Sequence, residues 1–153
     1  MKIGVPKEIK PQENRIGLTP DSVKTLTSSG HEVLVQSDGG FEAGFDDNQY
    51  KSAGAKIVNK AEDIFNDAEI IVKVKEPLSN EVKMLRENQI VFTYLHLAAA
   101  KELTKGLVDS KAVCIAYETV TDNNGRLPLL APMSAVAGRM SVQAGAHLSL
   151  IHI

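Results

Sequence analysis

Hydrophobic positions along the chain alternate between short β-type runs and stretches with helical spacing. Apolar runs typical of buried strands lie at residues 2–5, 31–37, 56–58, 69–74, 89–95 and 111–117. Helical patterns separate most of them, and the first is expected to begin with Thr19 as its N-cap and Pro20 at its first position. Strands that alternate with helices of about ten residues predict an α/β fold with a mostly parallel sheet covered on both faces.

The pattern changes after the last strand. The segment TDNNGR at residues 121–126 contains an Asn-Gly pair, which predicts a β-hairpin turn. A long helical stretch follows from about Met133 and carries small residues such as Ala137, Gly138 and Ala144. We therefore expect an α/β region that is followed by a separate C-terminal helix.

Charged and titratable side chains follow three of the predicted strands. Arg15 lies in the loop after the first strand, Lys75 follows the 69–74 strand, and His96 follows the 89–95 strand. In open α/β sheets, ligands bind beyond the carboxyl ends of the strands. The three side chains are therefore expected at the same edge of the sheet. Lys73, at the end of its own strand, is an alternative to Lys75 that spacing alone leaves open.

Two cations and an imidazole at one edge suit a small carboxylate beside a group that gains or loses a proton. Arginine can hold a carboxylate through two parallel hydrogen bonds, lysine can polarise a carbonyl, and histidine can exchange protons near neutral pH. This set favours a 2-oxo acid or a 2-amino acid as the ligand. The alternative is that each residue is an ordinary surface charge or a structural histidine at a strand end.

Composition and charge exclude several other classes. The chain has 153 residues and a net charge of −2, so it presents no basic field for nucleic acid or an anionic membrane. No His/Cys cluster or carboxylate pair has the spacing of metal ligands, and no G-x-G-x-x-G dinucleotide motif occurs. The single cysteine, Cys114, lies in an apolar run and cannot form a disulfide within the chain. This favours a location in the reducing cytoplasm. We expect Cys114 and His31 to be structural.

Several segments together resemble a known family. MKIGVPKEIKPQENRIGLTP, IIVKVKEPL, FTYLHLAA and LPLLAPMSAVAGRMSVQAGAH are similar, in register over residues 1 to about 147, to bacterial alanine dehydrogenases. The larger family includes the alpha subunit of nicotinamide nucleotide transhydrogenase. That subunit lacks the lysine of KVKEP and the histidine of YLHLA, both of which are present here. A transhydrogenase relative and a non-catalytic carboxylate-binding module are the alternative interpretations.

The resemblance implies a fold, a reaction and roles for individual residues. It implies a Rossmann-like (flavodoxin-like) α/β fold, and an NAD-dependent conversion of L-alanine to pyruvate and ammonium by a cytoplasmic hexamer. Arg15 and Lys75 would bind the substrate, His96 would donate and accept protons, and Ser134 would contact NAD. On this basis Lys75 is preferred to Lys73.

The same resemblance implies a domain organisation. Residues 1–128 would form the first part of a substrate domain, and residues 129–147 a linker helix that begins an NAD-binding domain missing from this chain. The tail at residues 148–153, LSLIHI, is unlike the family, so it is expected to be non-native and His152 to have no function. The 153-residue chain alone is expected to lack dehydrogenase activity.

Overall fold

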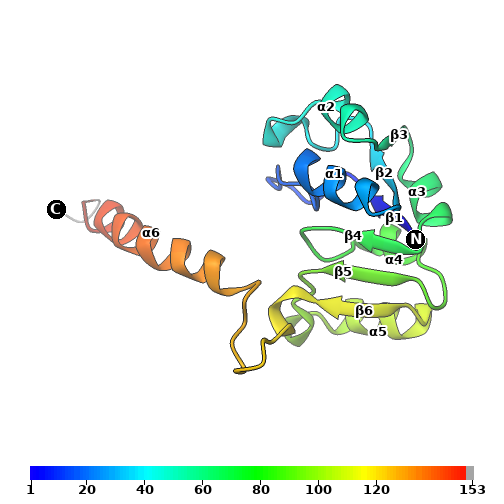
Figure 1. Cartoon of the computed structure of the whole chain (residues 1–153). Helices are drawn as coiled ribbons and strands as arrows, with labels where there is room; N and C mark the ends of the chain where they lie inside the picture. Colours follow the sequence, from blue (N-terminus) through cyan, green and yellow to red (C-terminus); the bar gives the residue numbers. More distant parts are fainter. Residues whose placement is uncertain (151–153) are drawn as a thin grey trace. The chain divides into compact units, whose positions relative to one another are not determined.

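A six-stranded parallel sheet forms the centre of the compact unit over Met1–Ala116 (Figure 1). The structure is a computed structural model that describes residues 1–150. The chain divides into one compact unit over Met1–Ala116 and a second unit from Tyr117 onward. The strands of the first unit are β1 (Lys2–Val5), β2 (Glu32–Gln36), β3 (Lys56–Val58), β4 (Ile70–Val72), β5 (Ile90–Thr93) and β6 (Val113–Ala116).

The strand order is β3-β2-β1-β4-β5-β6, and every neighbouring pair is parallel. This is the doubly wound order of Rossmann folds, so the predicted α/β, Rossmann-like class is confirmed. The chain first winds from β1 toward β3 and then returns to place β4 on the other side of β1. The order therefore reverses between β1 and β4, where such folds bind ligands.

Helices cover the two faces of the sheet. They are α1 (Pro20–Ser28), α2 (Asp47–Ser52), α3 (Ala61–Asp67), α4 (Ser79–Val82) and α5 (Lys101–Ser110), with short 3-10 turns η1 (Phe41–Ala43) and η2 (Leu97–Ala99). Val23 of α1 and Tyr50 of α2 pack with Val5 and Val35 on one face. On the opposite face, Phe65 of α3 and Leu107 of α5 pack with other strand residues. The alternation of side chains along each strand produces these two apolar cores.

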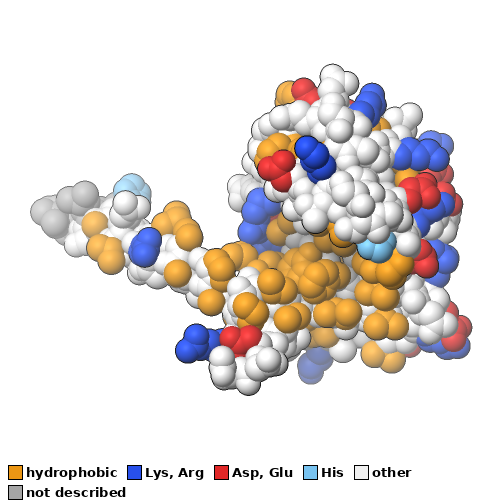
Figure 2. Space-filling model, in the orientation of Figure 1, with side chains coloured by type: hydrophobic (Ala, Val, Ile, Leu, Met, Phe, Trp, Pro, Cys, Tyr) orange, Lys and Arg blue, Asp and Glu red, His pale blue; other side chains and the backbone are white. Residues whose placement is uncertain are grey.

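The first of these faces is not covered along its full width. Val113 and Ile115 of β6 alternate toward it and are 47% and 40% exposed, and their β5 neighbours Ile90 and Phe92 are half-buried. Figure 2 shows hydrophobic side chains gathered over β5 and β6. The β1–β2–β3 side is thus packed on both faces, whereas the β5–β6 side exposes an apolar surface.

Two local expectations have different outcomes. Thr19 is the N-cap of α1, its side chain accepts from the backbone of Ser22, and Pro20 is the first helical residue, as predicted. The hairpin predicted at residues 121–126 is wrong, because no strand flanks the turn. Instead Asp122 Oδ1 accepts from the backbone nitrogens of Asn124 and Arg126. The following Pro128 lacks the N–H that a paired strand would need.

The second unit contains the 3-10 turn η3 (Tyr117–Thr119) and the helix α6 (Ala131–Leu150). The predicted C-terminal helix is present and begins two residues before Met133. Its apolar residues Val136 and Met140 are 57% and 58% exposed. Among the described residues no helix combines the length and apolarity needed to cross a bilayer. Leu148–Leu150 continue α6, while His152 and the rest of the predicted tail lie outside the described residues.

Candidate active site

The loops that follow β1, β4 and β5 carry the three predicted substrate residues. These strands are neighbours, and all run in the same direction, so their carboxyl ends share one edge of the sheet. Lys75 and His96 each lie three residues beyond the end of their strand. The loop with Arg15 reaches this edge through Gly17, where an added Cβ would lie 2.6 Å from the carbonyl oxygen of Val72. The absence of a side chain at Gly17 allows this close approach.

Glu13 holds Arg15 at this edge. Arg15 Nε donates to Glu13 Oε1 at 2.7 Å, and Nη2 donates to Oε2 at 2.6 Å. The hydrogen bond from the Arg15 side chain lowers the pKa of Glu13 to about 2, with a contribution from the charge of Lys75. The same pair raises the pKa of Arg15. Glu13, Arg15 and Lys75 therefore interact electrostatically. We call these three residues and His96 the edge cluster.

The two alternative lysines differ in their surroundings. Lys73 is 1% exposed, and its ammonium lies 3.2 Å from Glu8 Oε2 and 2.8 Å from Glu81 Oε1. We call these three residues the interior cluster. The other oxygen of Glu8 accepts from the backbone nitrogens of Val74 at 2.6 Å and Lys75 at 3.3 Å. Lys75 is half-buried and its side chain makes no hydrogen bond or ion pair with the described residues. Lys75 is thus available to a ligand, whereas Lys73 holds the fold.

His96 occupies the junction between β5 and η2. Its backbone adopts the left-handed conformation with φ 52 and ψ 38, which is uncommon for residues other than glycine. Its Nδ1 lies 3.4 Å from Glu76 Oε2, and the same carboxylate pairs with Lys10. Burial would raise the pKa of Glu76, but the Lys10 hydrogen bond and the charges of Lys10 and His96 outweigh burial and lower it. The Glu76 carboxylate thus lies on the Nδ1 side of the imidazole.

Tyr94 lies beside His96 at this edge of the sheet, with its ring centroid 6.1 Å from that of His96. Reasoning from the sequence missed Tyr94, and also Glu8, Glu13 and Glu76. Glu13, Glu76 and Tyr94 lie within two residues of Arg15, Lys75 and His96, and that proximity is the signal that could have identified them.

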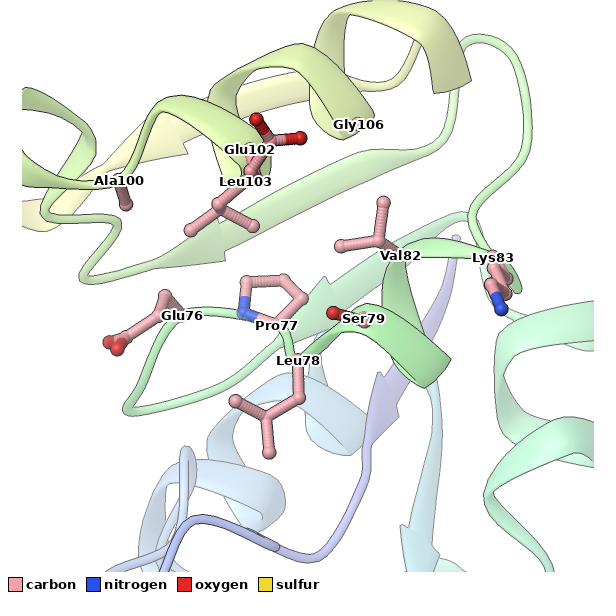
Figure 3. Close-up of a pocket in the computed structure, with 10 residues that line it drawn as sticks. All are labelled: Glu76, Pro77, Leu78, Ser79, Val82, Lys83, Ala100, Glu102, Leu103 and Gly106. Carbon is pink, nitrogen blue, oxygen red and sulfur yellow. The ribbon is translucent and has the colours of Figure 1, made fainter.

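A cavity of about 470 Å³ opens beside this edge, between α4 and α5 (Figure 3). Figure 3 shows Val82 and Leu103 on its facing walls and Glu76 at one end. The two helices approach closely because residue 106 is a glycine, whose added Cβ would lie 2.9 Å from Val82 Cγ1. None of Arg15, Lys75 and His96 lines this cavity. We therefore place the candidate site at the strand ends and not in the α4–α5 cavity.

The described residues contain no G-x-G-x-x-G dinucleotide motif. Rossmann folds that bind dinucleotides place a short glycine-rich turn between the first strand and the first helix. Here residues 6–19 separate β1 from α1, without G-x-G-x-x-G. Ser134, the predicted NAD contact, is exposed in the first turn of α6 and belongs to the second unit. Its role remains a prediction.

Comparisons with known proteins agree with this description. The chain is 57% identical to the alanine dehydrogenase of Halomonas elongata over 147 residues. The matched region covers 96% of this chain and 40% of that relative. A solved L-alanine dehydrogenase matches with a TM-score of 0.90 and 54% identity, over 96% of this chain and 40% of the other. The transhydrogenase from Sinorhizobium meliloti matches with a TM-score of 0.73 and 27% identity, over 77% of this chain and 35% of the other.

The chain therefore spans about two fifths of the length of the curated relatives that it matches. These relatives are named alanine dehydrogenases, and the similarity extends along nearly the whole of this chain. The family "Alanine dehydrogenase/PNT, N-terminal domain" matches residues 4–137, which is most of the described structure. The chain thus belongs to the alanine dehydrogenase/PNT family and corresponds to its N-terminal domain.

Proposed function

We propose that this chain supplies the substrate-binding and proton-transfer residues of an NAD-dependent L-alanine dehydrogenase. The reaction is the reversible oxidative deamination of L-alanine to pyruvate and ammonium. The observation that carries this proposal is the meeting of Arg15, Lys75 and His96 at the carboxyl edge of three adjacent strands. The names of the relatives and their identity to this chain support the same reaction.

Each of the three residues has a defined task. The guanidinium of Arg15 binds the substrate carboxylate, because it offers planar paired donors. The ammonium of Lys75 lies against the 2-oxo oxygen and stabilises the negative charge that develops there. Nε2 of His96 exchanges protons with the reacting centre, and the Glu76 carboxylate lies on the Nδ1 side of the ring. Arg15 and Lys75 thereby orient a small 2-oxo or 2-amino acid against the imidazole.

NAD, the oxidant of this reaction, needs a dinucleotide site, and the described residues contain no G-x-G-x-x-G motif. The part of the reaction that we assign to this chain is therefore substrate binding and proton transfer, and Ser134 is proposed as one contact to NAD. Assembly into a hexamer and location in the cytoplasm belong to the same proposal. Both rest on the family resemblance.

The test joins residues 1–147 of this chain to the remainder of the Halomonas elongata relative, and we call the product the joined protein. The joined protein should form NADH from NAD and L-alanine, and a variant with both Arg15→Ala and Lys75→Ala should not. The chain alone should bind pyruvate, with NMR shift changes confined to the loops after β1, β4 and β5, but should form no NADH. A folded but inactive joined protein would disprove the catalytic proposal and favour a carboxylate-binding module.

A further inference from the structure

We propose that Glu13 is the positioning residue of the substrate carboxylate site, where it fixes the plane of the Arg15 guanidinium. Glu13 does not itself contact the substrate in this proposal. It holds one edge of Arg15 so that the other edge is presented to a monocarboxylate. The inference rests on the proposed function and adds a residue to which the sequence assigned no role.

The contacts between the two side chains determine the orientation of the guanidinium. Glu13 accepts from Nε and Nη2 of Arg15 along one side of the group, at 2.7 and 2.6 Å. The backbone nitrogen of Arg15 also donates to Glu13 Oε1 at 3.0 Å. A guanidinium is planar and its five N–H groups have fixed directions, so two parallel bonds along one edge fix the whole plane.

The opposite edge of the guanidinium remains available. Nη1 donates to no residue in the described part of the chain, and Nη2 donates only to Glu13. Together Nη1 and Nη2 form a second pair of donors that can bind another carboxylate. The Arg15 side chain is 48% exposed, whereas that of Glu13 is 7% exposed. The Glu13 carboxylate that holds Arg15 is thus mostly buried, whereas about half of the Arg15 side chain is exposed.

The charges at this position fit a monoanion. Glu13 is ionised throughout the neutral range, because the Arg15 hydrogen bond lowers its pKa to about 2. Arg15 and Lys75 contribute two positive charges, and the negative charge of Glu13 neutralises one of them. The remaining unit charge matches one substrate carboxylate, and the buried Glu13 carboxylate stays compensated when the site is empty.

The opposite interpretation is that Glu13 competes with the substrate for Arg15. A competitor would have to occupy the donors that the substrate uses, so its removal would tighten pyruvate binding. Glu13 instead occupies the side of the guanidinium formed by Nε and one N–H of Nη2, which leaves the second N–H of Nη2 and the N–H groups of Nη1 for a substrate. Its removal should therefore weaken binding. The sign of the change in pyruvate affinity separates the two interpretations.

The experiment compares Glu13→Gln with Glu42→Gln in the joined protein. Glu42 is a suitable control, because it lines the same small hollow as Glu13 and Arg15 but is exposed and makes no hydrogen bond to a described residue. Glu13→Gln should raise the KM for pyruvate about tenfold, because a guanidinium that is no longer held in one plane loses orientation when it binds the carboxylate. The kcat should stay within about twofold, since no reacting atom is altered. Glu42→Gln should change neither quantity.

Two further measurements show whether Glu13 acts through Arg15. Glu13→Gln should have little effect in an Arg15→Lys background, because lysine has no plane to orient. Glu13→Asp should retain part of the affinity, since one carboxylate bond to the guanidinium can form. Pyruvate titration of the same variants in the 153-residue chain should give matching ratios of Kd, so the test does not depend on turnover.

Each contrary result has a definite meaning. A lower KM in Glu13→Gln, an unchanged KM, or an equal effect in both Arg15 backgrounds would overturn the proposal. So would a variant that only melts at a lower temperature and keeps normal pyruvate affinity in the folded state. If Arg15→Lys itself leaves the KM unchanged, the error lies in the proposed role of Arg15 and not in the link between Glu13 and Arg15.

Discussion

The interior cluster and the edge cluster both contain basic and acidic side chains, but they differ in whether the basic groups have all their hydrogen-bond acceptors within the protein. In the interior cluster, the Lys73 ammonium and the carboxylates of Glu8 and Glu81 are between 1% and 3% exposed and paired with one another. In the edge cluster, Lys75 and one side of Arg15 have no acceptor among the described residues. Lys73 and Lys75 are separated by only one residue, so burial and not residue type decides which charge holds the fold and which can bind a ligand.

Glu8 connects the two regions. One of its oxygens pairs with Lys73, and the other accepts from the backbone nitrogens of Val74 and Lys75. Both nitrogens lie just beyond the end of β4 and need an acceptor when they are buried. The interior cluster therefore fixes the main chain from which Lys75 projects, and the edge cluster uses a backbone that is already positioned.

Removal of the interior cation should have the largest effect on stability. Lys73→Met leaves Glu8 and Glu81 buried without their cation, and it should lower the free energy of unfolding by about 3–5 kcal/mol. Urea unfolding of the 153-residue chain followed by circular dichroism measures this loss. Lys75→Met is the matched control and should cost less than about 1 kcal/mol, because its ammonium makes no hydrogen bond or ion pair with the described residues. Equal losses in the two variants would remove the distinction between the clusters.

These two lysines also show how far the sequence could predict the structure. The alternation of apolar residues placed Lys73 and Lys75 at the end of a strand, and the parallel sheet brought Arg15, Lys75 and His96 to one edge, as expected. The alternation could not predict that Lys73 turns inward. Its partner Glu8 is 65 residues away in a loop without periodicity, so the pairing depends on tertiary packing.

The local arrangements within loops were equally difficult to predict. Glu13 and Arg15 are near in sequence, but only the folded loop shows that Glu13 binds one side of the guanidinium. The Asn-Gly pair indicated a hairpin because such turns usually join strands. At residues 121–126 the Asp122 side chain accepts hydrogen bonds from backbone nitrogens of the turn. The turn therefore forms without a second strand. Short polar side chains can form hydrogen bonds with the backbone of their own loop, and the hydrophobic pattern of the sequence does not predict these bonds.

Within the edge cluster, His96→Asn should have the largest effect on turnover. Asparagine keeps a similar size and hydrogen-bonding capacity but cannot titrate. The kcat of the joined protein should fall by roughly 10²- to 10⁴-fold, the usual contribution of a positioned proton-transfer group. The limb of the pH–rate profile that is assigned to an imidazole should also disappear.

His31→Asn is the control for this substitution. His31 lies just before β2, at the opposite end of the strands, and should be replaceable without loss of rate. Near-normal turnover and an unchanged pH profile in His96→Asn would mean that His96 only shapes the turn between β5 and η2.

Arg15→Ala should have a smaller effect, and on a different kinetic constant. Loss of the guanidinium removes charge-assisted hydrogen bonds to the substrate carboxylate that contribute about 1.5–3 kcal/mol. The KM for L-alanine and for pyruvate should therefore rise by roughly ten- to a hundredfold. The kcat should fall less than in His96→Asn, because Arg15 moves no proton. A fall in kcat with an unchanged KM would contradict a carboxylate-binding role.

The smallest expected effect is the acid sensitivity that Glu13 gives to the fold. In the folded protein the Arg15 hydrogen bond lowers the pKa of Glu13 to about 2, below the roughly 4.3 of a glutamate in an unfolded chain. A lowered pKa contributes stability that is fully present above the unfolded value and is lost as the pH falls toward the folded value. Near pH 6, Glu13→Gln should be less stable than the wild type by about 1 kcal/mol, because the exposed Arg15 limits the gain from the pair.

The difference in stability should shrink as the pH falls toward about 2 and disappear below that value, where the wild-type carboxyl is protonated in the folded state as well. Urea unfolding of the two chains at several pH values measures it, and Glu42→Gln should follow the wild type throughout, because Glu42 has no hydrogen-bonded partner among the described residues. A difference that persists at low pH would show that glutamine disturbs the loop through its shape and not through the lost charge. In that case the contribution of Glu13 to stability would not come from its ion pair with Arg15.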